Sequence, residues 1–320
     1  MKPSALIVEA EFYPPDLLRR LETRVSIIES SAITQVQLRS ELLLHNTEIL
    51  FCGLGINIDE SLLGQVTNIR YIVSPATGTN HLDLDYLKLR NIKLIYLGDL
   101  SDEISSVFST AELSWSLLLA VVRNIIPAHR SVVSGSFDRG PFLGIDLAGR
   151  TLGIIGDGRL GRRVAEYGQA FGMRVVVCDT DNLKVLNLAN GINACSLDRL
   201  LTISDVISIH VPLTEQTHRL ITDSEISKMK SGVVLVNTSR GEVIDELAIV
   251  EALKSGKLYG VGVDVLVGEN AADFSSVKSP LVIAASQNLN VVVSPHIGGW
   301  TTQAVATTRS LVVEELFRQL

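Results

Sequence analysis

The sequence predicts an α/β protein that contains two doubly wound parallel-sheet domains. Short apolar runs alternate with amphipathic stretches along most of the chain, which is the pattern of βαβ units in a parallel sheet. The length of 320 residues exceeds what one ordinary core accommodates, so two domains are expected. A glycine-rich turn at residues 156–161 lies between a predicted strand and a predicted helix, as in a nucleotide-binding domain.

Each element of the first series is predicted from its own residues. Four apolar runs in the first hundred residues are predicted strands, and three amphipathic stretches between them are predicted helices. The strands are Ala5–Val8, Ile49–Phe51, Tyr71–Val73 and Lys93–Tyr96, and the helices lie near Pro15–Glu22, Thr34–Leu44 and Asp83–Arg90.

A second series follows a long helix and a loop. The helix is predicted over Ala111–His129, and the loop over Ser134–Arg150 is rich in Gly, Asp, Arg and Pro. Strands are then predicted at Thr151–Ile155, Arg174–Cys178, Val206–His210, Val233–Val236, Tyr259–Val265 and Val291–Ser294, with a helix from Arg159 to Phe171 between the first two. We therefore expect two parallel-sheet domains with a cleft between them.

Composition and charge exclude several functional classes. The net charge of −7 is spread along the chain without a Lys/Arg-rich block, so no nucleic-acid or anionic-membrane partner is expected. The most hydrophobic stretch, Leu113–Ile126, is interrupted by Arg123 and is shorter than the roughly 20 apolar residues of a membrane span. A buried core helix is predicted there. The three cysteines form no metal-ligand pair, which favours reduced thiols in a cytoplasmic protein and predicts no metal site.

The turn Gly156-Asp-Gly158-Arg-Leu-Gly161 predicts a dinucleotide site. Alone the motif is weak evidence, but the strand before it and the helix after it are what phosphate binding requires. Gly156 allows the tight turn, Gly158 lets the backbone approach a pyrophosphate, and Gly161 lets helix and strand pack closely. Asp179 ends the next strand, where an acid hydrogen-bonds the adenosine ribose and repels the 2′-phosphate of NADP. The predicted cofactor is NAD.

Three residues past the ends of later strands are predicted to carry the chemistry. Arg240 follows the apolar run Val233–Val236 and presents a planar cation suited to a carboxylate. Glu269 and His296 follow two further strands, and a carboxylate beside an imidazole stabilises its protonated form. Such a pair can donate a proton to a carbonyl oxygen or take one from an alcohol. Each residue alone is more often a surface or loop residue; their order after the cofactor motif favours a site.

His210 ends an apolar strand and is predicted to be structural rather than a second base. The residues after it, Val211 and Pro212, are predicted to line the cofactor site.

Taken together, these segments resemble the D-isomer-specific 2-hydroxyacid dehydrogenase family over nearly the whole chain. The segments that carry the resemblance are Gly78-Thr-Asn-His-Leu-Asp83, Thr110-Ala-Glu112, Gly156–Gly161, His210-Val-Pro-Leu-Thr214, Asn237-Thr-Ser-Arg240-Gly and His296-Ile-Gly-Gly299.

The resemblance implies a flavodoxin-like substrate domain from residues 1–100 and 300–320, with a Rossmann NAD-binding domain inserted over 101–299. It also implies that Arg240, Glu269 and His296 form the catalytic triad, and that backbone amides around Thr77 and Gly78 help hold the substrate carboxylate. Thr110 and Asp264 would lie near the nicotinamide. The remaining cofactor contacts expected are Arg159, Leu160, His210, Thr217, Thr238, Ser239, His296 and Gly298.

The predicted activity is NAD-dependent interconversion of a small 2-hydroxy acid and its 2-oxo acid. Two alternatives stay open: a non-enzymatic NAD-sensing scaffold of the corepressor type, and a formate- or phosphite-type dehydrogenase. The chain departs from the family where Asn270 replaces the usual proline and where the loop Ala271–Gln287 is unusual. The segment Val73–Thr77 also lacks the basic residue of phosphoglycerate dehydrogenases, which disfavours phosphoglycerate as substrate.

A homodimer is predicted from the helix over Ala111–His129. Its apolar residues cover most of the circumference, so more than one neighbour must cover it. One side can pack on its own sheet and a second subunit can cover the other, as the family resemblance implies; complete burial within one chain is the alternative.

Overall fold

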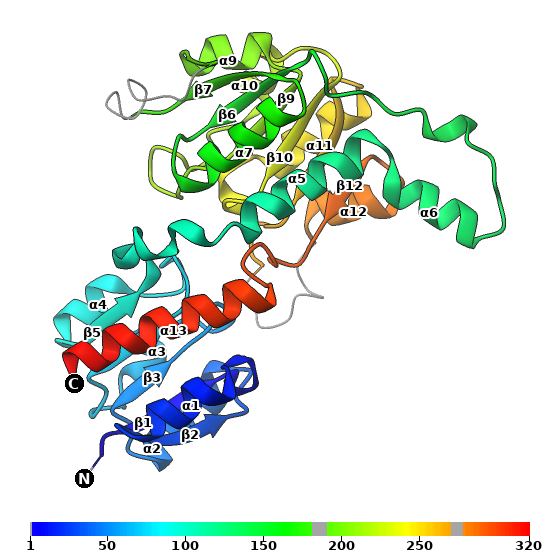
Figure 1. Ribbon diagram of the computed structural model, residues 1–320. Coiled ribbons are helices and arrows are strands. Elements are labelled where there is room, and N and C mark those ends of the chain that lie inside the picture. Colours follow the sequence, from blue (N-terminus) through cyan, green and yellow to red (C-terminus); the bar gives the residue numbers. More distant parts are fainter. Residues whose placement is uncertain (1, 181–190, 270–277) are drawn as a thin grey trace. The chain divides into compact units, whose positions relative to one another are not determined.

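The computed structural model describes residues 2–180, 191–269 and 278–320, which form two compact units, each built on its own parallel sheet (Figure 1). The first unit runs from the N-terminus to Val107 and includes Trp300–Leu320. The second unit starts at Phe108 and ends at Gly299.

The first unit has, among its described residues, a five-stranded parallel sheet in the order β2-β1-β3-β4-β5. This is the order of flavodoxin-like sheets. The strands are β1 (Ser4–Val8), β2 (Ser26–Ser30), β3 (Ile49–Phe51), β4 (Tyr71–Ser74) and β5 (Lys93–Tyr96). The helices are α1 (Pro15–Glu22), α2 (Gln35–Leu44), α3 (Glu60–Leu63), α4 (Leu84–Leu89) and α13 (Thr302–Gln319), with 3₁₀ turns η1 (Ala10–Phe12), η2 (Leu97–Leu100) and η3 (Glu103–Ser106).

The core of the first unit lies on both faces of this sheet, because successive strand residues point to opposite sides. Ala5 and Ile7 face one apolar cluster, and Leu6 faces the other. The C-terminal helix α13 packs on the first of these faces through Val312 and Leu316, so the last residues of the chain complete the N-terminal core.

Residues 101–107 belong to this first unit, although the sequence analysis assigned them to the second domain. Ile104 is buried in the first core and Val107 packs against it. The short turn η3 therefore buries its apolar side chains on the first sheet.

The second unit has, among its described residues, a seven-stranded parallel sheet in the order β12-β11-β10-β9-β6-β7-β8. This is the Rossmann order with one further strand, β12. The strands are β6 (Thr151–Ile155), β7 (Arg174–Cys178), β8 (Ile192–Ala194), β9 (Val206–Ile209), β10 (Val233–Asn237), β11 (Leu258–Val263) and β12 (Val291–Val293). The helices are α5 (Ser109–Val122), α6 (Ile125–Val133), α7 (Arg159–Ala170), α9 (Leu197–Ile203), α10 (Asp223–Lys228), α11 (Glu246–Lys254) and α12 (Pro280–Ser286), with turns η4 (Gly140–Phe142) and η5 (Gly241–Val243).

The continuous helix predicted over Ala111–His129 is wrong: α5 ends at Val122 and α6 begins at Ile125. Asn124 breaks the helix because its backbone is left-handed, with φ of 52°. Its side-chain amide donates to Leu143 O at 3.2 Å and to the hydroxyl of Tyr259 at 2.8 Å, which holds the break in place.

Helix α5 is the buried core helix that the sequence predicted. In the part of the chain that the structure describes, Glu103–Val122 is long and apolar enough to cross a membrane by length and composition. That stretch is not one helix, since η3 ends at Ser106 and α5 starts at Ser109. Residues such as Leu117 and Val121 are buried against β10 and β11, which is the environment of a core helix.

Candidate active site

The glycine-rich turn joins β6 to α7 in the second unit. Gly156 has a φ of 101°, and a Cβ atom there would lie 2.7 Å from the backbone oxygen of His210, so only glycine fits. Gly158 is the N-cap of the twelve-residue helix α7, and nothing lies within 4 Å of the place where its Cβ would be. An open helix N-terminus with a free approach suits the pyrophosphate of a dinucleotide.

Asp179 follows β7 and reaches this turn. Its Oδ2 accepts a hydrogen bond of 2.6 Å from the backbone amide of Asp157, the second residue of the turn. Asp157 is itself buried and pairs with Arg162 at 3.1 Å. The structure therefore brings Asp179, the acid predicted to bind the ribose, to the turn predicted to bind the pyrophosphate. Asp157 and Arg162 support this turn, and no role was predicted for either of them.

His210 follows β9 on the other side of Gly156. Burial lowers its pKa to about 4, so the imidazole is neutral at ordinary pH. Its Nε2 lies 2.8 Å from Ser208 Oγ, while Nδ1 is buried without a hydrogen-bond partner among the described residues. The side chain of Val211 also packs at Gly156. Thr217 donates its hydroxyl to Pro212 O at 2.6 Å and so closes the turn that follows His210.

Arg240 follows β10, and the buried side chain of Asn237 shapes its loop. Asn237 Oδ1 accepts from the backbone amide of Ser239 at 3.0 Å and from its hydroxyl at 2.7 Å, while Nδ2 donates to Arg240 O at 2.8 Å. Burial lowers the pKa of Arg240, and the negative charges of Glu269 and Glu242 oppose that shift.

Three further predicted cofactor residues, Thr238, Arg159 and Leu160, are buried or packed in the second unit. Thr238 is buried with its hydroxyl 2.6 Å from that of Ser114 on α5. At the start of α7, burial lowers the pKa of Arg159, and Leu160 packs against the core of the second unit.

His296 and Glu269 form a hydrogen-bonded pair. His296 Nδ1 lies 2.5 Å from Glu269 Oε1, and Glu269 Oε2 accepts from the backbone amide of Leu266 at 2.9 Å. His296 has a left-handed backbone with φ of 52° and donates its amide to Asp264 O at 2.8 Å. A non-glycine residue in this conformation is held by its surroundings, as is common at functional sites.

Asp264 holds the loop that carries His296. Its side chain is 1% exposed; Oδ1 accepts from Ser294 Oγ at 2.6 Å and from Ile297 N at 2.9 Å, and Oδ2 accepts from Gly298 N at 2.7 Å. A Cβ atom at Gly298 would lie 3.0 Å from Thr110 Cγ2, so Thr110, Asp264 and Gly298 are neighbours.

The three predicted catalytic residues follow three adjacent strands, β10, β11 and β12, at the carboxyl edge of one sheet. This edge is where ligands bind in open α/β sheets. The arrangement provides a cation for an anionic substrate group and an imidazole, oriented by a carboxylate, for proton transfer. Thr77 and Gly78 follow β4 in the first unit, and Thr77 is exposed there. Asn270 and residues 271–277 of the unusual loop lie outside the described residues.

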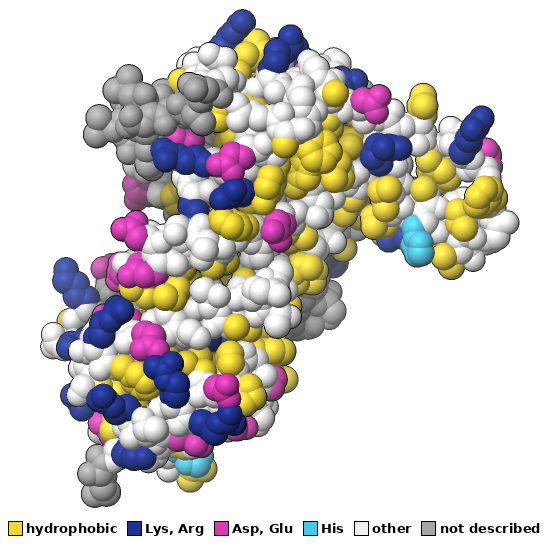
Figure 2. Space-filling view, in the orientation of Figure 1, with side chains coloured by type: hydrophobic (Ala, Val, Ile, Leu, Met, Phe, Trp, Pro, Cys, Tyr) yellow, Lys and Arg dark blue, Asp and Glu magenta, His cyan; other side chains and the backbone are white. Residues whose placement is uncertain are grey.

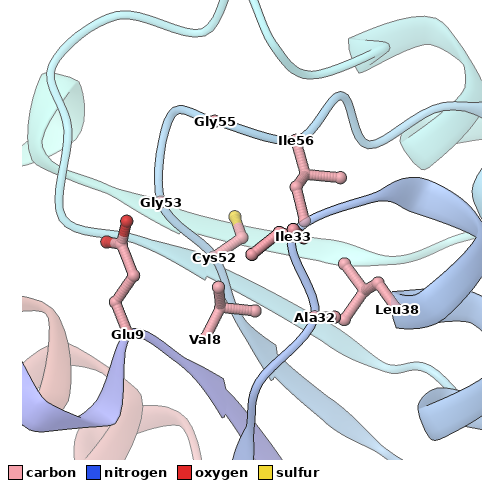
Figure 3. A pocket seen from close by; sticks show the side chains of 9 residues that line it. All are labelled: Val8, Glu9, Ala32, Ile33, Leu38, Cys52, Gly53, Gly55 and Ile56. Carbon is pink, nitrogen blue, oxygen red and sulfur yellow. The ribbon is translucent and has the colours of Figure 1, made fainter. Parts of the chain in front are cut away.

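The first unit carries a pocket of about 210 Å³ at the carboxyl ends of β1 and β3 (Figure 3). Its lining is Val8, Glu9, Ala32, Ile33, Leu38, Cys52, Gly53, Gly55 and Ile56. Glu9 lies on one side, and the apolar side chains face it from the other. Burial raises the pKa of Glu9, and the charge of Arg309, 3.9 Å away, opposes that shift. The sequence analysis did not predict this pocket.

A comparison with protein families identifies the chain. The model of the D-isomer-specific 2-hydroxyacid dehydrogenase NAD-binding domain matches residues 115–298, more than half of the sequence. The chain belongs to this family. The predicted family and fold class are confirmed, and residues 115–298 are an NAD-binding domain, as predicted from the turn at Gly156.

Individual relatives agree with this 2-hydroxyacid dehydrogenase assignment. The chain is 34% identical to a hydroxypyruvate reductase of Thermotoga maritima over 85% of each sequence. It is 32% identical to the D-3-phosphoglycerate dehydrogenase of Bacillus subtilis over 91% of this chain, which spans 54% of that longer protein. Among solved structures, the D-lactate dehydrogenase of Aquifex aeolicus, complexed with NAD and lactic acid, has a TM-score of 0.81 at 29% identity, covering 99% of this chain and 95% of that one.

Proposed function

We propose that this 2-hydroxyacid dehydrogenase interconverts a small D-2-hydroxy acid and its 2-oxo acid with NAD. The observation that carries the proposal is the 2.5 Å hydrogen bond between His296 and Glu269, beside the loop of Arg240 in the NAD-binding unit. Relatives named as reductases of glyoxylate and hydroxypyruvate support the same substrate class.

The residues of the cofactor site fit NAD. The open amide end of α7 at Gly158 suits the pyrophosphate, and the carboxylate of Asp179 beside the turn suits a ribose hydroxyl but repels a 2′-phosphate. Near Gly298, Thr110 and Asp264 are placed together, where the family resemblance expects the nicotinamide. When bound, the reduced cofactor supplies the hydride that reaches C2 of the substrate.

In the reductive direction Arg240 binds the substrate carboxylate with its planar guanidinium and polarises the C2 carbonyl. His296 donates its proton to the C2 oxygen as that oxygen gains negative charge. Glu269 holds His296 through Nδ1, so Nε2 is the nitrogen that carries the transferred proton. In the oxidative direction His296 takes the proton from the C2 hydroxyl.

A substrate without phosphate is favoured. The segment Val73–Thr77 carries no basic side chain, so a phosphate group has no cation there. As the family resemblance expects, the backbone amides around Thr77 and Gly78 are proposed to help hold the substrate carboxylate.

The test is NADH oxidation with purified protein across pyruvate, glyoxylate, hydroxypyruvate and 3-phosphohydroxypyruvate. We expect turnover with at least one of the first three at higher kcat/KM than with the phosphorylated acid. Tight NADH binding without turnover of any 2-oxo acid would reject the enzyme and revive the scaffold alternative. Parallel assays with formate and phosphite as hydride donors to NAD separate the remaining alternative.

We further propose that the protein works as a homodimer through α6 and the segment that follows it. Within the described residues α6 buries none of its side chains: Val132 and Val133 are exposed, and beyond it Phe137 is 94% and Leu143 86% exposed. Figure 2 shows hydrophobic side chains gathered on this projecting part of the second unit. Apolar surface of this kind is normally covered by a partner, and the family resemblance points to a second copy.

Light scattering at micromolar concentration tests the dimer: we expect twice the 34.7 kDa chain mass. A Val133→Asp variant should shift the mass toward the monomer, and wild-type protein with the mass of one chain would reject the proposal.

All three cysteines are free thiols, which supports the proposal of a reducing, cytoplasmic location.

A further inference from the structure

Glu246 is the first residue of α11, and its carboxylate is buried with only 6% of the residue exposed. Burying a charged group is costly unless hydrogen bonds compensate it. Both oxygens are compensated: Oε1 accepts from the backbone amide of Val267 at 2.9 Å, and Oε2 accepts from Ser279 Oγ at 2.8 Å. The side chain therefore has two specific partners on another part of the chain.

These partners lie on either side of Glu269. Val267 comes two residues before it, in the turn that follows β11, and Ser279 is the N-cap of α12. Glu246 thus links the turn before Glu269 to helix α12, which follows Glu269 in the sequence. Residues 270–277 lie between these two points in the sequence and outside the described residues.

The turn before Glu269 is held at consecutive amides. The amide of Leu266 donates to Glu269 Oε2, and the next amide, that of Val267, donates to Glu246 Oε1. On the other side the backbone of this turn packs directly on Gly241, where a Cβ atom would lie 2.2 Å from Leu266 C. Glu246 and Gly241 together fix the orientation in which Glu269 reaches both Leu266 N and His296.

A simpler role as a helix cap does not account for these contacts. Asp245 is already the N-cap of α11, and its Oδ1 accepts from the amides of Leu247 and Ala248. The oxygens of Glu246 point instead to partners outside α11. The helix N-terminus favours a carboxylate at this position but does not select Val267 and Ser279 as its partners.

We propose that Glu246 is a positioning residue that acts through Glu269 by fixing the Val267 turn. The proposal rests on the proposed function, in which Glu269 orients His296 for proton transfer. Glu246 touches neither substrate nor cofactor; its effect reaches the reaction through the Glu269–His296 pair.

The first measurement needs no turnover. Hydrogen exchange of peptides covering residues 264–269, read by mass spectrometry, should be about tenfold faster in Glu246→Ala, because the bond to a charged acceptor is lost. Glu246→Gln should restore protection, since its side-chain oxygen accepts from Val267 N and its amide donates to Ser279 Oγ. Glu251→Ala, an exposed glutamate on the same helix, is the matched control and should exchange like wild type. Wild-type protection in Glu246→Ala would overturn the proposal even if no substrate were found.

The second measurement is a double-mutant cycle on reductive turnover. Glu246→Ala should lower kcat on the order of 10- to 100-fold, with NADH affinity unchanged and kcat recovered in Glu246→Gln. In a Glu269→Ala background the same substitution should lower kcat less than about twofold, because the residue it positions is gone. An equal loss in both backgrounds would show that Glu246 acts on general stability and would overturn the proposal. Inactive wild-type protein would instead reject the proposed function.

Should Glu246→Ala fail to fold, Ser279→Ala replaces it, since it removes one of the two bonds. We expect a smaller loss of kcat in the same direction, again absent in the Glu269→Ala background. A loss that persists in that background would count against the proposal.

Discussion

At the carboxyl edge of the seven-stranded sheet, buried polar side chains hold the loops that carry Arg240, Glu269 and His296. Asn237 holds the first, Glu246 the second and Asp264 the third. At the same edge of the five-stranded sheet, the loops after β3 and β4 are held by backbone bonds such as Ile58 N to His81 O and Leu97 N to Ala76 O, and by one buried contact of 3.4 Å between Ser74 Oγ and His81 Nε2.

The two carboxyl edges differ in the groups proposed to contact ligands, which are side chains in the second unit and backbone amides in the first. Side chains that bind or transfer protons must be held in one rotamer, and a buried carboxylate or amide near the loop does this through several directional bonds. Backbone amides, such as those proposed at Thr77 and Gly78, need only the loop path to be fixed. Among the described residues, the buried carboxylates and amide that hold site loops, Asn237, Glu246 and Asp264, therefore lie in the second unit, and substitutions there should affect turnover most.

The largest effect is expected at Arg240, the proposed substrate clamp. Arg240→Ala should lower kcat/KM for reduction by roughly 10³-fold or more, because a positioned cation on the reacting acid is lost. Arg240→Lys should recover only part of this loss, since lysine cannot bind a carboxylate with two parallel bonds. NADH affinity, measured by fluorescence, should stay near wild type in both variants. Retained turnover in Arg240→Ala would move the substrate site elsewhere.

Glu269→Gln should lower reductive kcat by roughly 100-fold, within the range of acid–base catalysis. The amide keeps a hydrogen bond to His296 but removes the negative charge beside the imidazole that donates the proton. Steady-state kinetics that return a wild-type kcat for Glu269→Gln would mean that the charge of Glu269 does not act through His296.

The loop-holding role of Asp264 should give a smaller loss. Asp264→Asn leaves one of the three donors around Asp264, from Ser294, Ile297 and Gly298, without an acceptor. We expect about 1–3 kcal/mol less stability in urea unfolding and roughly tenfold lower kcat. Asp205→Asn is the control: Asp205 accepts from Thr151 N at the amino edge of the same sheet and should lower stability without lowering kcat. Similar kcat losses in the two variants would mean that the carboxyl edge of this sheet is no more important for turnover than its amino edge.

Asp179→Ala should change cofactor choice more than rate. The ratio of kcat/KM with NADPH to that with NADH should rise roughly tenfold, since about 1.4 kcal/mol of repulsion toward the 2′-phosphate is relieved. Steady-state kinetics with both cofactors measure this ratio. Wild-type protein that prefers NADPH would show that Asp179 has another role.

His210 should affect acid stability rather than turnover at neutral pH. Its folded pKa of about 4 lies below the ordinary value of 6.5, so the unfolded chain takes up the proton first as the pH falls. The stability linked to neutral His210 is thus complete above pH 6.5 and is lost at about 1 kcal/mol per pH unit toward pH 4. His210→Asn should remove this part of the pH dependence in urea unfolding between pH 7.5 and 4.5. Identical slopes in both proteins would contradict the burial effect.

The sequence predicted the inner strands well because they are continuous apolar runs. It missed β2 (Ser26–Ser30) and β8 (Ile192–Ala194), since both are short edge strands with half-exposed or exposed residues and no apolar run. The break between α5 and α6 was also missed, because a left-handed Asn124 is stabilised by Leu143 and Tyr259, which are distant in sequence.

The predicted site residues were those whose chemistry is visible in their type and order, such as Arg240 and His296. The loop-holding roles were missed, although Asp264 itself was expected near the nicotinamide. Asn237 belongs to the family segment Asn237-Thr-Ser-Arg240-Gly, but no role was predicted for it. Glu246 resembled an ordinary acid at the start of a helix. Its role depends on Val267 and Ser279, which only the tertiary structure brings to it.

The most direct test of the proposed function is chiral analysis of the product formed from NADH and the better substrate of pyruvate and hydroxypyruvate, since glyoxylate gives an achiral product, with wild type and Arg240→Ala run side by side. The proposed function predicts the D-2-hydroxy acid from wild type, in amounts equal to the NADH consumed, and almost none from the variant. An L or racemic product, or equal D product from both proteins, would contradict it.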